Sequence, residues 1–260
     1  MRRALTLIAL ALVCAPAAAA DPPSPGVTHV KVPAGTPPVA WGAQLFGANC
    51  VTCHGPNGQG ILTPVRGVGD QTGLGPSLVG VGARAADFYL RTGYMPLDDS
   101  HSQPRRSRVL FSQRELAALV AYVASLGPGP RVPSPQPERG SLADGQESFT
   151  EHCAGCHQIA AEGGYVTNAV APSLDQASPV EIAEAVRTGP YLMPRFSEKQ
   201  ISNAELDSVI RYVTYAKHPD DRGGWALGHL GPVPEGLVTW FIGIVLLVAT
   251  CAVIGRRFHA

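Results

Sequence analysis

Four cysteines of this 260-residue chain stand in two short motifs that each end in a histidine. The motifs have the same spacing and are Cys50, Cys53, His54 and Cys153, Cys156, His157. On a helical turn, residues three and four positions apart share a face, so both thiols and the imidazole of each motif point to one side. This pattern predicts the covalent attachment of one haem c at each motif, with the histidine as an iron ligand.

Three other interpretations of the cysteine pairs fit the sequence less well. A four-cysteine zinc site brings its second pair within about 20 residues, whereas Cys50 and Cys153 are 103 positions apart. A thioredoxin-like redox pair needs a βαβ setting, which the sequence does not show. A disulfide across two intervening residues closes too small a loop to stabilise the fold much.

Two methionines are the candidates for the second ligand of each iron. Met95 and Met193 are each followed by proline, and Met1 is the only other methionine. Both lie at matched positions after a cysteine motif, which favours iron ligation over the filling of a core gap. We therefore predict the axial pairs His54 with Met95 and His157 with Met193. Such pairs give a comparatively high reduction potential.

Further polar groups could complete each site. A ligating histidine needs its other ring nitrogen bonded, and the carbonyls of Pro76 and Pro172 are the candidates. Arg91 and Arg187 either pair with haem propionates or lie as solvated surface charges, and the sequence leaves both possibilities open. His101, in a polar insert of the first half, is expected to be an exposed loop residue rather than a competing ligand.

The two motifs lie in two halves of the chain that match along their length. In the same order, Gly42, Phe46, Pro76, Arg91 and Met95 correspond to Gly145, Phe149, Pro172, Arg187 and Met193. Five matched features in one order indicate a tandem duplication. Helical periodicity precedes each cysteine pair and closes each half, and no alternation of polarity is long enough to suggest a sheet. The sequence predicts an all-α fold.

Proline-rich stretches and apolar runs divide the chain into segments. We predict a signal peptide at 1–20, a Pro-rich linker at 21–39, domains at 40–126 and 138–219 joined by a Pro-rich linker at 127–137, a juxtamembrane segment at 220–236, a transmembrane helix at 237–255 and a cytoplasmic tail at 256–260. The N-terminal segment has a basic start, an apolar run and small residues ending at Ala20. This layout predicts a cleaved secretory signal or a retained anchor.

The C-terminal segment 237–255 contains 19 residues without a charge. At about 1.5 Å per residue it spans roughly the 30 Å hydrocarbon core of a membrane. Arg256 and Arg257 follow at once, and by the positive-inside rule they hold the C-terminus in the cytoplasm, while Trp240 suits the opposite interface. Residues 21–236 are therefore expected on the extracytoplasmic face of the cell membrane.

Charge and composition exclude some classes of function. Twenty Lys and Arg balance twenty Asp and Glu, so the whole chain lacks the basic excess that nucleic-acid binding needs. The run 80–85 matches a loose dinucleotide-binding pattern, but no βαβ unit surrounds it. The basic cluster Arg105, Arg106 and Arg108 is either a solvated loop face or a partner-docking surface. Domains this small bury little core, so the haem should complete each one.

With these residues placed, the chain resembles the dihaem cytochrome c subunit of the actinobacterial menaquinol:cytochrome c reductase, the cytochrome bcc complex. The resemblance rests on the two haem motifs, the two Met-Pro pairs, the run 231–236, a span containing Trp240 and a basic end. It implies two tandem class I cytochrome c domains plus one C-terminal transmembrane helix. It also implies a complex with cytochrome b and a Rieske iron-sulfur subunit, in which electrons pass from the Rieske centre to the copper centre of a terminal oxidase.

Two alternative functions remain open at the level of sequence. A dihaem peroxidase would need an open iron position for peroxide, which two methionine ligands disfavour. A cytochrome subunit of a different membrane dehydrogenase, such as one oxidising alcohols, would share the haem motifs but not the partners. The order in which the two haems receive the electron does not follow from the sequence.

Overall fold

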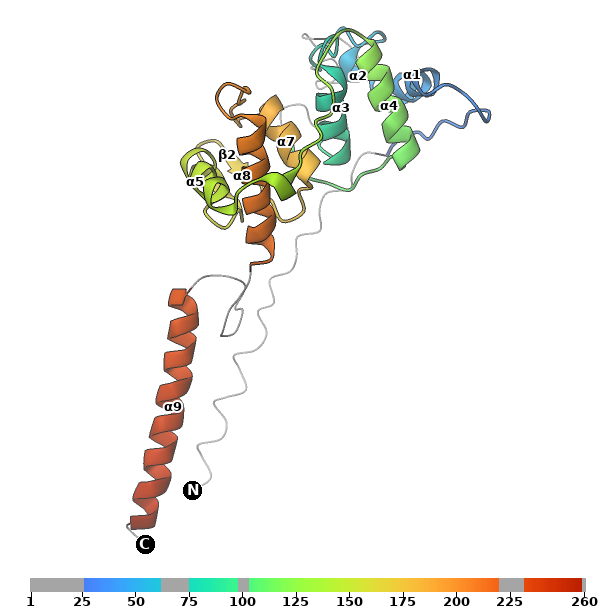
Figure 1. The fold of residues 1–260 in the computed structure, drawn as a ribbon. Helices are drawn as coiled ribbons and strands as arrows, with labels where there is room; N and C mark the ends of the chain where they lie inside the picture. Colours follow the sequence, from blue (N-terminus) through green and yellow to red (C-terminus); the bar gives the residue numbers. More distant parts are fainter. Residues whose placement is uncertain (1–25, 62–74, 98–102, 220–231, 259–260) are drawn as a thin grey trace, which may run out of the picture. The chain divides into compact units, whose positions relative to one another are not determined.

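A computed structural model of the protein (Figure 1) describes residues 26–61, 75–97, 103–219 and 232–258. These residues are mostly helical, which confirms the predicted all-α class, and the one sheet among them is a short two-stranded hairpin. The chain divides into two compact units between Pro133 and Ser134, within the predicted linker 127–137. The predicted signal peptide and residues 220–231 of the predicted juxtamembrane segment lie outside the described residues.

The described part of the first unit contains four helices around one apolar core. They are α1 (Pro38–Asn49), α2 (Val51–His54), α3 (Gly82–Arg91) and α4 (Gln113–Ser125). Helix α1 crosses α4 at Gly42, where a β-carbon would lie only 2.0 Å from the carbonyl oxygen of Ala118. One turn later, Phe46 packs against Tyr122 with ring centroids 5.1 Å apart. Glycine is needed here because any side chain would separate two helices that are packed at core density.

The second unit repeats this crossing with other residues. Its elements are η1 (Pro137–Arg139), α5 (Leu142–His152), α6 (Ala154–His157), β1 (Gly164–Val166), β2 (Ala169–Ala171), α7 (Pro179–Thr188) and α8 (Asn203–Lys217). Helix α5 crosses α8 at Gly145, where a β-carbon would lie 2.0 Å from the carbonyl oxygen of Ser208. Phe149 packs against Tyr212 with ring centroids 5.2 Å apart. The matched glycine and phenylalanine of the two halves therefore mark the same helix crossing.

The middle helices α3 and α7, which the sequence pattern did not predict, begin in different ways. Helix α7 starts with a capping box between Ser178 and Glu181 and has Pro179 at its first position. Helix α3 follows Val81, which provides no side-chain cap. A side-chain cap satisfies backbone N–H groups that a helix start leaves unbonded, and it stabilises a helix by about 1 kcal/mol.

Strands β1 and β2 form an antiparallel hairpin in which Tyr165 lies opposite Val170. Asn168 occupies the turn with a φ of 63°, a left-handed conformation that asparagine tolerates better than most residues. Each strand has three residues. Alternating polarity could not predict strands this short, because the pattern needs at least about four residues.

The N-terminal segment before α1 is fastened to the first unit. Val27 and Val30 pack against its core, and the Trp41 indole donates a hydrogen bond to the Val30 carbonyl at 2.9 Å. Asn49 accepts from the Thr28 amide at 2.7 Å and donates to the Thr28 carbonyl at 3.0 Å. The described part of the predicted linker 21–39 is therefore extended backbone held on the domain, and α1 already begins at Pro38.

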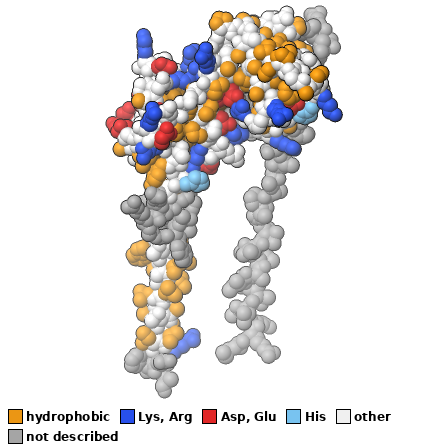
Figure 2. Space-filling model, turned by 45° about the vertical axis from the view of Figure 1, so that its right-hand side comes forward, with side chains coloured by type: hydrophobic (Ala, Val, Ile, Leu, Met, Phe, Trp, Pro, Cys, Tyr) orange, Lys and Arg blue, Asp and Glu red, His pale blue; other side chains and the backbone are white. Residues whose placement is uncertain are grey.

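Helix α9 (Pro232–Phe258) is the one helix among the described residues that is long and apolar enough to cross a membrane. Its 21-residue stretch Gly236–Arg256 has a mean hydropathy of 2.7. Hydrophobic side chains cover the part of this helix visible in Figure 2. A helix that is apolar on all sides needs either a protein core or a lipid environment around it.

Candidate functional site

Both cysteine motifs lie where one helix ends and a short second helix begins. Cys50 ends α1 through a hydrogen bond from its amide to the Phe46 carbonyl at 2.8 Å, and α2 follows. Cys153 ends α5 in the same way, with its amide 2.8 Å from the Phe149 carbonyl. The amides of His54 and His157 then each bond the carbonyl of the first cysteine of their motif at 2.9 Å. Each motif thus closes one helical turn, which places its first cysteine and its histidine on one face.

None of the four motif cysteines forms a disulfide. Burial raises the pKa of Cys50 to about 12, and the nearby Cys53 adds to the shift. Burial likewise raises the pKa of Cys153 to about 11, with a further contribution from Cys156. A buried, protonated thiol fits a sulfur that ends as a neutral thioether. Among the residues that the structure describes, no three His, Cys, Asp or Glu side chains form a set that could hold a metal ion alone.

The ring orientation of both histidines is fixed by a proline carbonyl, as predicted. His54 Nδ1 lies 2.8 Å from the Pro76 carbonyl oxygen, and His157 Nδ1 lies 3.0 Å from that of Pro172. A carbonyl can only accept, so Nδ1 carries the proton and Nε2 keeps its lone pair. Burial lowers the pKa of both imidazoles, although these hydrogen bonds act to raise it. The neutral imidazole that results is the form that binds iron.

Two glycines that were not predicted as site residues from the sequence help to position the carbonyls of Pro76 and Pro172. Gly60 and Gly163 both have positive φ, 80° and 78°, and their amides bond the carbonyls of His54 and His157 at 2.8 and 3.0 Å. A β-carbon on Gly60 would lie 2.8 Å from the carbonyl carbon of Pro76, and one on Gly163 would lie 2.6 Å from that of Pro172. Each glycine stands six residues after its histidine. Alignment of the two halves of the chain on their histidines would therefore have matched Gly60 with Gly163.

The two candidate methionine ligands follow the middle helices. Met193 and Cys153 both pack against the core cluster of the second unit. Met95 is half-buried in the first unit, and its amide bonds the Tyr89 carbonyl of α3 at 3.0 Å. Iron ligation by the two sulfurs stays a prediction.

The two matched arginines have protein partners. Arg91 pairs with Asp87 at 2.8 Å and donates to Gln113. Arg187 is only 6% exposed and donates to the Asn203 side chain at 2.9 Å and to the Phe196 carbonyl at 3.3 Å. The possibility of a solvated surface charge is therefore wrong for Arg187, which instead fastens the segment after Met193. Pairing with propionates stays a prediction.

Two further sequence predictions fall on other parts of the chain. His101, which was expected to be an exposed loop residue, lies outside the described residues. The basic cluster of the first half is described, and Arg105 and Arg108 are exposed.

Exposed apolar side chains flank the second site. Ile159, two residues after His157, is 53% exposed, and Leu192, directly before Met193, is 56% exposed. Both are neighbours in sequence of a predicted iron ligand, and exposed apolar groups at such positions fit a surface that a hydrophobic ligand covers. The thiol pair, the neutral imidazole, the thioether and this apolar surface together fit a covalent haem c.

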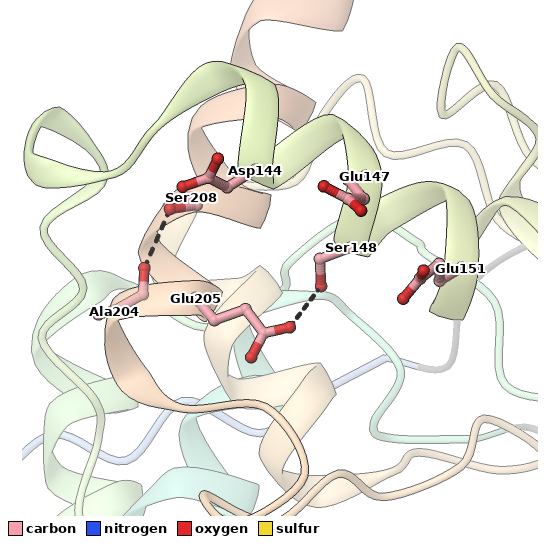
Figure 3. Close-up of a pocket in the computed structure, with 7 residues that line it drawn as sticks. All are labelled: Asp144, Glu147, Ser148, Glu151, Ala204, Glu205 and Ser208. Atoms are coloured by element: carbon pink, nitrogen blue, oxygen red, sulfur yellow. Dashed lines mark hydrogen bonds between the residues drawn. The ribbon is translucent and has the colours of Figure 1, made fainter.

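A separate groove between α5 and α8 carries acidic side chains (Figure 3). Its lining consists of Asp144, Glu147, Ser148, Glu151, Ala204, Glu205 and Ser208. Ser148 donates to Glu205 at 2.9 Å, and Ser208 donates to the Ala204 carbonyl at 3.1 Å. No predicted haem residue lines this groove, so it is an acidic surface distinct from the haem site.

Protein-family models of cytochromes match both halves of the chain. Residues 39–127 match the model described as cytochrome c. Residues 140–213 match the model described as cytochrome c oxidase, cbb3-type, subunit III. Cytochrome c domains imply covalently bound haem c, and the two matches cover the two predicted domains.

Curated relatives extend the likeness over most of the chain. The cytochrome bc1 complex cytochrome c subunit of Corynebacterium diphtheriae is 37% identical over 83% of this chain and 80% of its own length. The subunit of the same name in Mycobacterium tuberculosis is 37% identical over 83% of this chain and 77% of its own. The Cbb3-type cytochrome c oxidase subunit CcoP of Azospirillum sp. is 28% identical over 67% of this chain and 61% of its own length. The resemblance found in the sequence is confirmed, and this chain belongs to the family of cytochrome c subunits of the cytochrome bc1 complex.

Proposed function

We propose that this chain is the dihaem electron-relay subunit of a quinol:cytochrome c reductase. It takes electrons from a Rieske iron-sulfur centre and passes them to a terminal oxidase. The observation that carries the proposal is the repetition of one site in both units, in which His54 and His157 each donate Nδ1–H to a proline carbonyl. A chain that only bound a partner would not need two such sites.

Each group of the site has a distinct task. The four motif cysteines would hold the two haem groups covalently, and the proline carbonyls orient the imidazoles and leave Nε2 able to bind iron. Met95 and Met193 would supply the second ligand of each iron, which would leave no open position for peroxide. When bound, haem c supplies a one-electron couple whose potential the thioether ligand raises. Cys50 and Cys153 pack against the apolar cores of their units, which fixes the position of each attachment turn.

Helix α9 anchors the chain in the cell membrane. Arg256 stands at the C-terminal end of its apolar stretch Gly236–Arg256, which favours a cytoplasmic C-terminus. The haem domains then lie on the extracytoplasmic face. This placement brings them to the side on which haem attachment and an oxidising compartment are expected.

Direct assembly with redox partners follows from this anchoring and from the relatives. Their name places these relatives in a cytochrome bc1 complex. Cytochrome b and a Rieske protein are therefore the proposed neighbours in the membrane, and a terminal oxidase is the proposed acceptor. The chain replaces a diffusible cytochrome c because its two haem domains are tethered to the complex.

The test is purification of the tagged full-length chain from its native membrane in a mild detergent. Mass spectrometry should identify cytochrome b and a Rieske protein, and added quinol should reduce both haems. A matched preparation that carries Cys153→Ala and Cys156→Ala should retain the partners but show one reducible haem. Co-purification with an alcohol dehydrogenase in place of cytochrome b would contradict the proposal.

A further inference from the structure

The neutral balance of the whole chain conceals two haem domains of opposite charge. Residues 26–133 contain nine Lys and Arg against five Asp and Glu, a net charge of +4. Residues 134–219 contain six against eleven, a net charge of −5. These counts include the residues outside the described ranges, among them Asp98 and Asp99. Charge of opposite sign on two otherwise similar domains points to different partners rather than to a common solubility requirement.

The connection after the methionine differs most between the two domains. In the second unit, Arg195 lies against the turn at Gly189, since a β-carbon on Gly189 would be 2.8 Å from the backbone nitrogen of Arg195. Arg195 stands only two residues after Met193. In the first unit the equivalent turn at Gly93 is crossed by Ser107, whose carbonyl oxygen would lie 2.4 Å from a β-carbon on Gly93. Ser107 stands twelve residues after Met95. The longer connection of the first unit contains the basic cluster.

This cluster is held in place rather than carried on a free loop. We call residues 105–108 the arginine strap. The Ser107 amide bonds the Thr92 carbonyl at 3.2 Å, and the Ser107 hydroxyl donates to the Gly93 carbonyl. Val109 then packs against the core of the first unit. The backbone of the strap therefore lies against the turn that directly precedes Met95.

Two of the three arginines of the strap are exposed at this fixed position. Arg105 and Arg108 are exposed, and Arg106 is half-buried. Because Ser107 is hydrogen-bonded to Thr92 and Gly93 and Val109 packs against the core, little backbone entropy is lost when a partner binds the flanking arginines. Guanidinium groups pair with carboxylates in a bidentate fashion, which suits recognition of an acidic surface.

From these observations, and resting on the proposed electron-relay function, we propose that the arginine strap is the docking surface of the first haem domain for a redox protein with a carboxylate-rich face. The strap steers that face toward the Met95 side of the first haem. The acidic groove of the second unit (Figure 3), with Asp144, Glu147 and Glu151, repels the same partner. Attraction of the acidic partner by the first domain and its repulsion by the second together make docking specific for the first domain.

The test is stopped-flow oxidation of the reduced, haem-loaded full-length chain in neutral detergent without lipid. The probe is plastocyanin, an acidic redox protein, and mitochondrial cytochrome c serves as the basic counterpart. Plastocyanin should react fast at low ionic strength and slow steeply as salt is added. Replacing the strap arginines together (Arg105→Gln, Arg106→Gln, Arg108→Gln) should lower the low-salt rate about tenfold and flatten the salt dependence.

A matched control removes the same charge elsewhere through Lys31→Gln, Arg131→Gln and Arg139→Gln, all at exposed positions. This control should stay within about twofold of the wild type. Equal slowing of both triple variants, or none in the strap variant, overturns the inference. An unchanged plastocyanin rate with lost binding to phosphatidylglycerol vesicles also overturns it and assigns the arginines to lipid. A wild-type chain without haem would instead contradict the proposed function.

Discussion

In both haem domains, the helix before the cysteines crosses the closing helix at a glycine, Gly42 in the first and Gly145 in the second. In both, the histidine reaches a proline carbonyl, yet the partners are 22 residues apart in the first domain and 15 in the second. The same hydrogen bond is therefore reached by loops of different length. Loop length costs little, because closure entropy grows only slowly with the number of residues.

The domains differ at their surfaces. The second domain has a two-stranded hairpin after its histidine and a capped middle helix, whereas α3 of the first domain has no side-chain cap. The first domain has the arginine strap, while the second has the acidic groove. The two domains share the helix crossing and the histidine–carbonyl hydrogen bond, which a covalent haem needs. They differ in the charged surfaces that a partner protein would contact. Matched substitutions in the two domains can test this division.

The largest effect is expected from removal of an attachment site. The double change Cys50→Ala and Cys53→Ala should leave one covalent haem, and so should Cys153→Ala with Cys156→Ala, because each domain binds its haem independently. Absorbance of the denatured protein counts the haem. Cys251→Ala in α9 serves as the control and should leave both. Loss of both haems from either double variant would show that the sites are not independent.

The next effect concerns the helix crossings. Gly42→Ala and Gly145→Ala should each destabilise their own domain by about 3 kcal/mol or more, since each new methyl would lie 2.0 Å from a backbone oxygen. Gly47→Ala in α1 has open space around it and should stabilise that helix by up to about 1 kcal/mol. Urea denaturation followed through each haem band measures both. A loss below about 1 kcal/mol at either crossing would contradict the packing described.

A more local effect is expected at the methionines. Met95→Ala and Met193→Ala should each open one iron position, so the reduced variants should bind one carbon monoxide per chain, while the wild type binds none. The absorbance spectrum of the reduced protein under carbon monoxide measures this. If Met95→Ala binds none while Met193→Ala does, another residue ligates the first iron, and the two sites are not equivalent.

The smallest effect tests a feature of the first domain alone. Glu115 caps α4 through Ser112 and pairs with His29 at 2.9 Å. Burial raises the pKa of Glu115, but hydrogen bonds from Ser112 and His29 outweigh it and lower the pKa overall. Glu115→Gln should therefore cost about 1 to 2 kcal/mol at pH 7.

The pH dependence of this cost follows from the lowered pKa. The stability that ionised Glu115 provides is present above its ordinary pKa of 4.5 and is lost as pH falls through the lower folded value. Urea denaturation at pH 7 and at successively lower pH should show the difference between wild type and Glu115→Gln shrink in this acidic range. The exposed Glu147→Gln in α5 should change little at any pH. A difference that grows on acidification would contradict the assignment.

Much of this architecture could be predicted from residue spacing. The periodicity of Leu116, Leu119 and Val123 predicts the closing helix because these side chains are all buried on one helix face. The proline carbonyls could be predicted because a ligating histidine needs an acceptor. Helices α3 and α7 could not be predicted from residue spacing, since each is only ten residues long and lies between loops. The partners of Arg187 also escaped prediction, because they come from a tertiary contact with Asn203.

The central claim is that this chain carries two matched covalent haem sites. Intact-mass analysis of the purified chain, followed by mapping of proteolytic peptides, tests it most directly. The account predicts a polypeptide plus two haem groups, with one haem on the peptide of Cys50 and Cys53 and one on that of Cys153 and Cys156. A chain with one haem or none, or with a disulfide in place of either attachment, would contradict it.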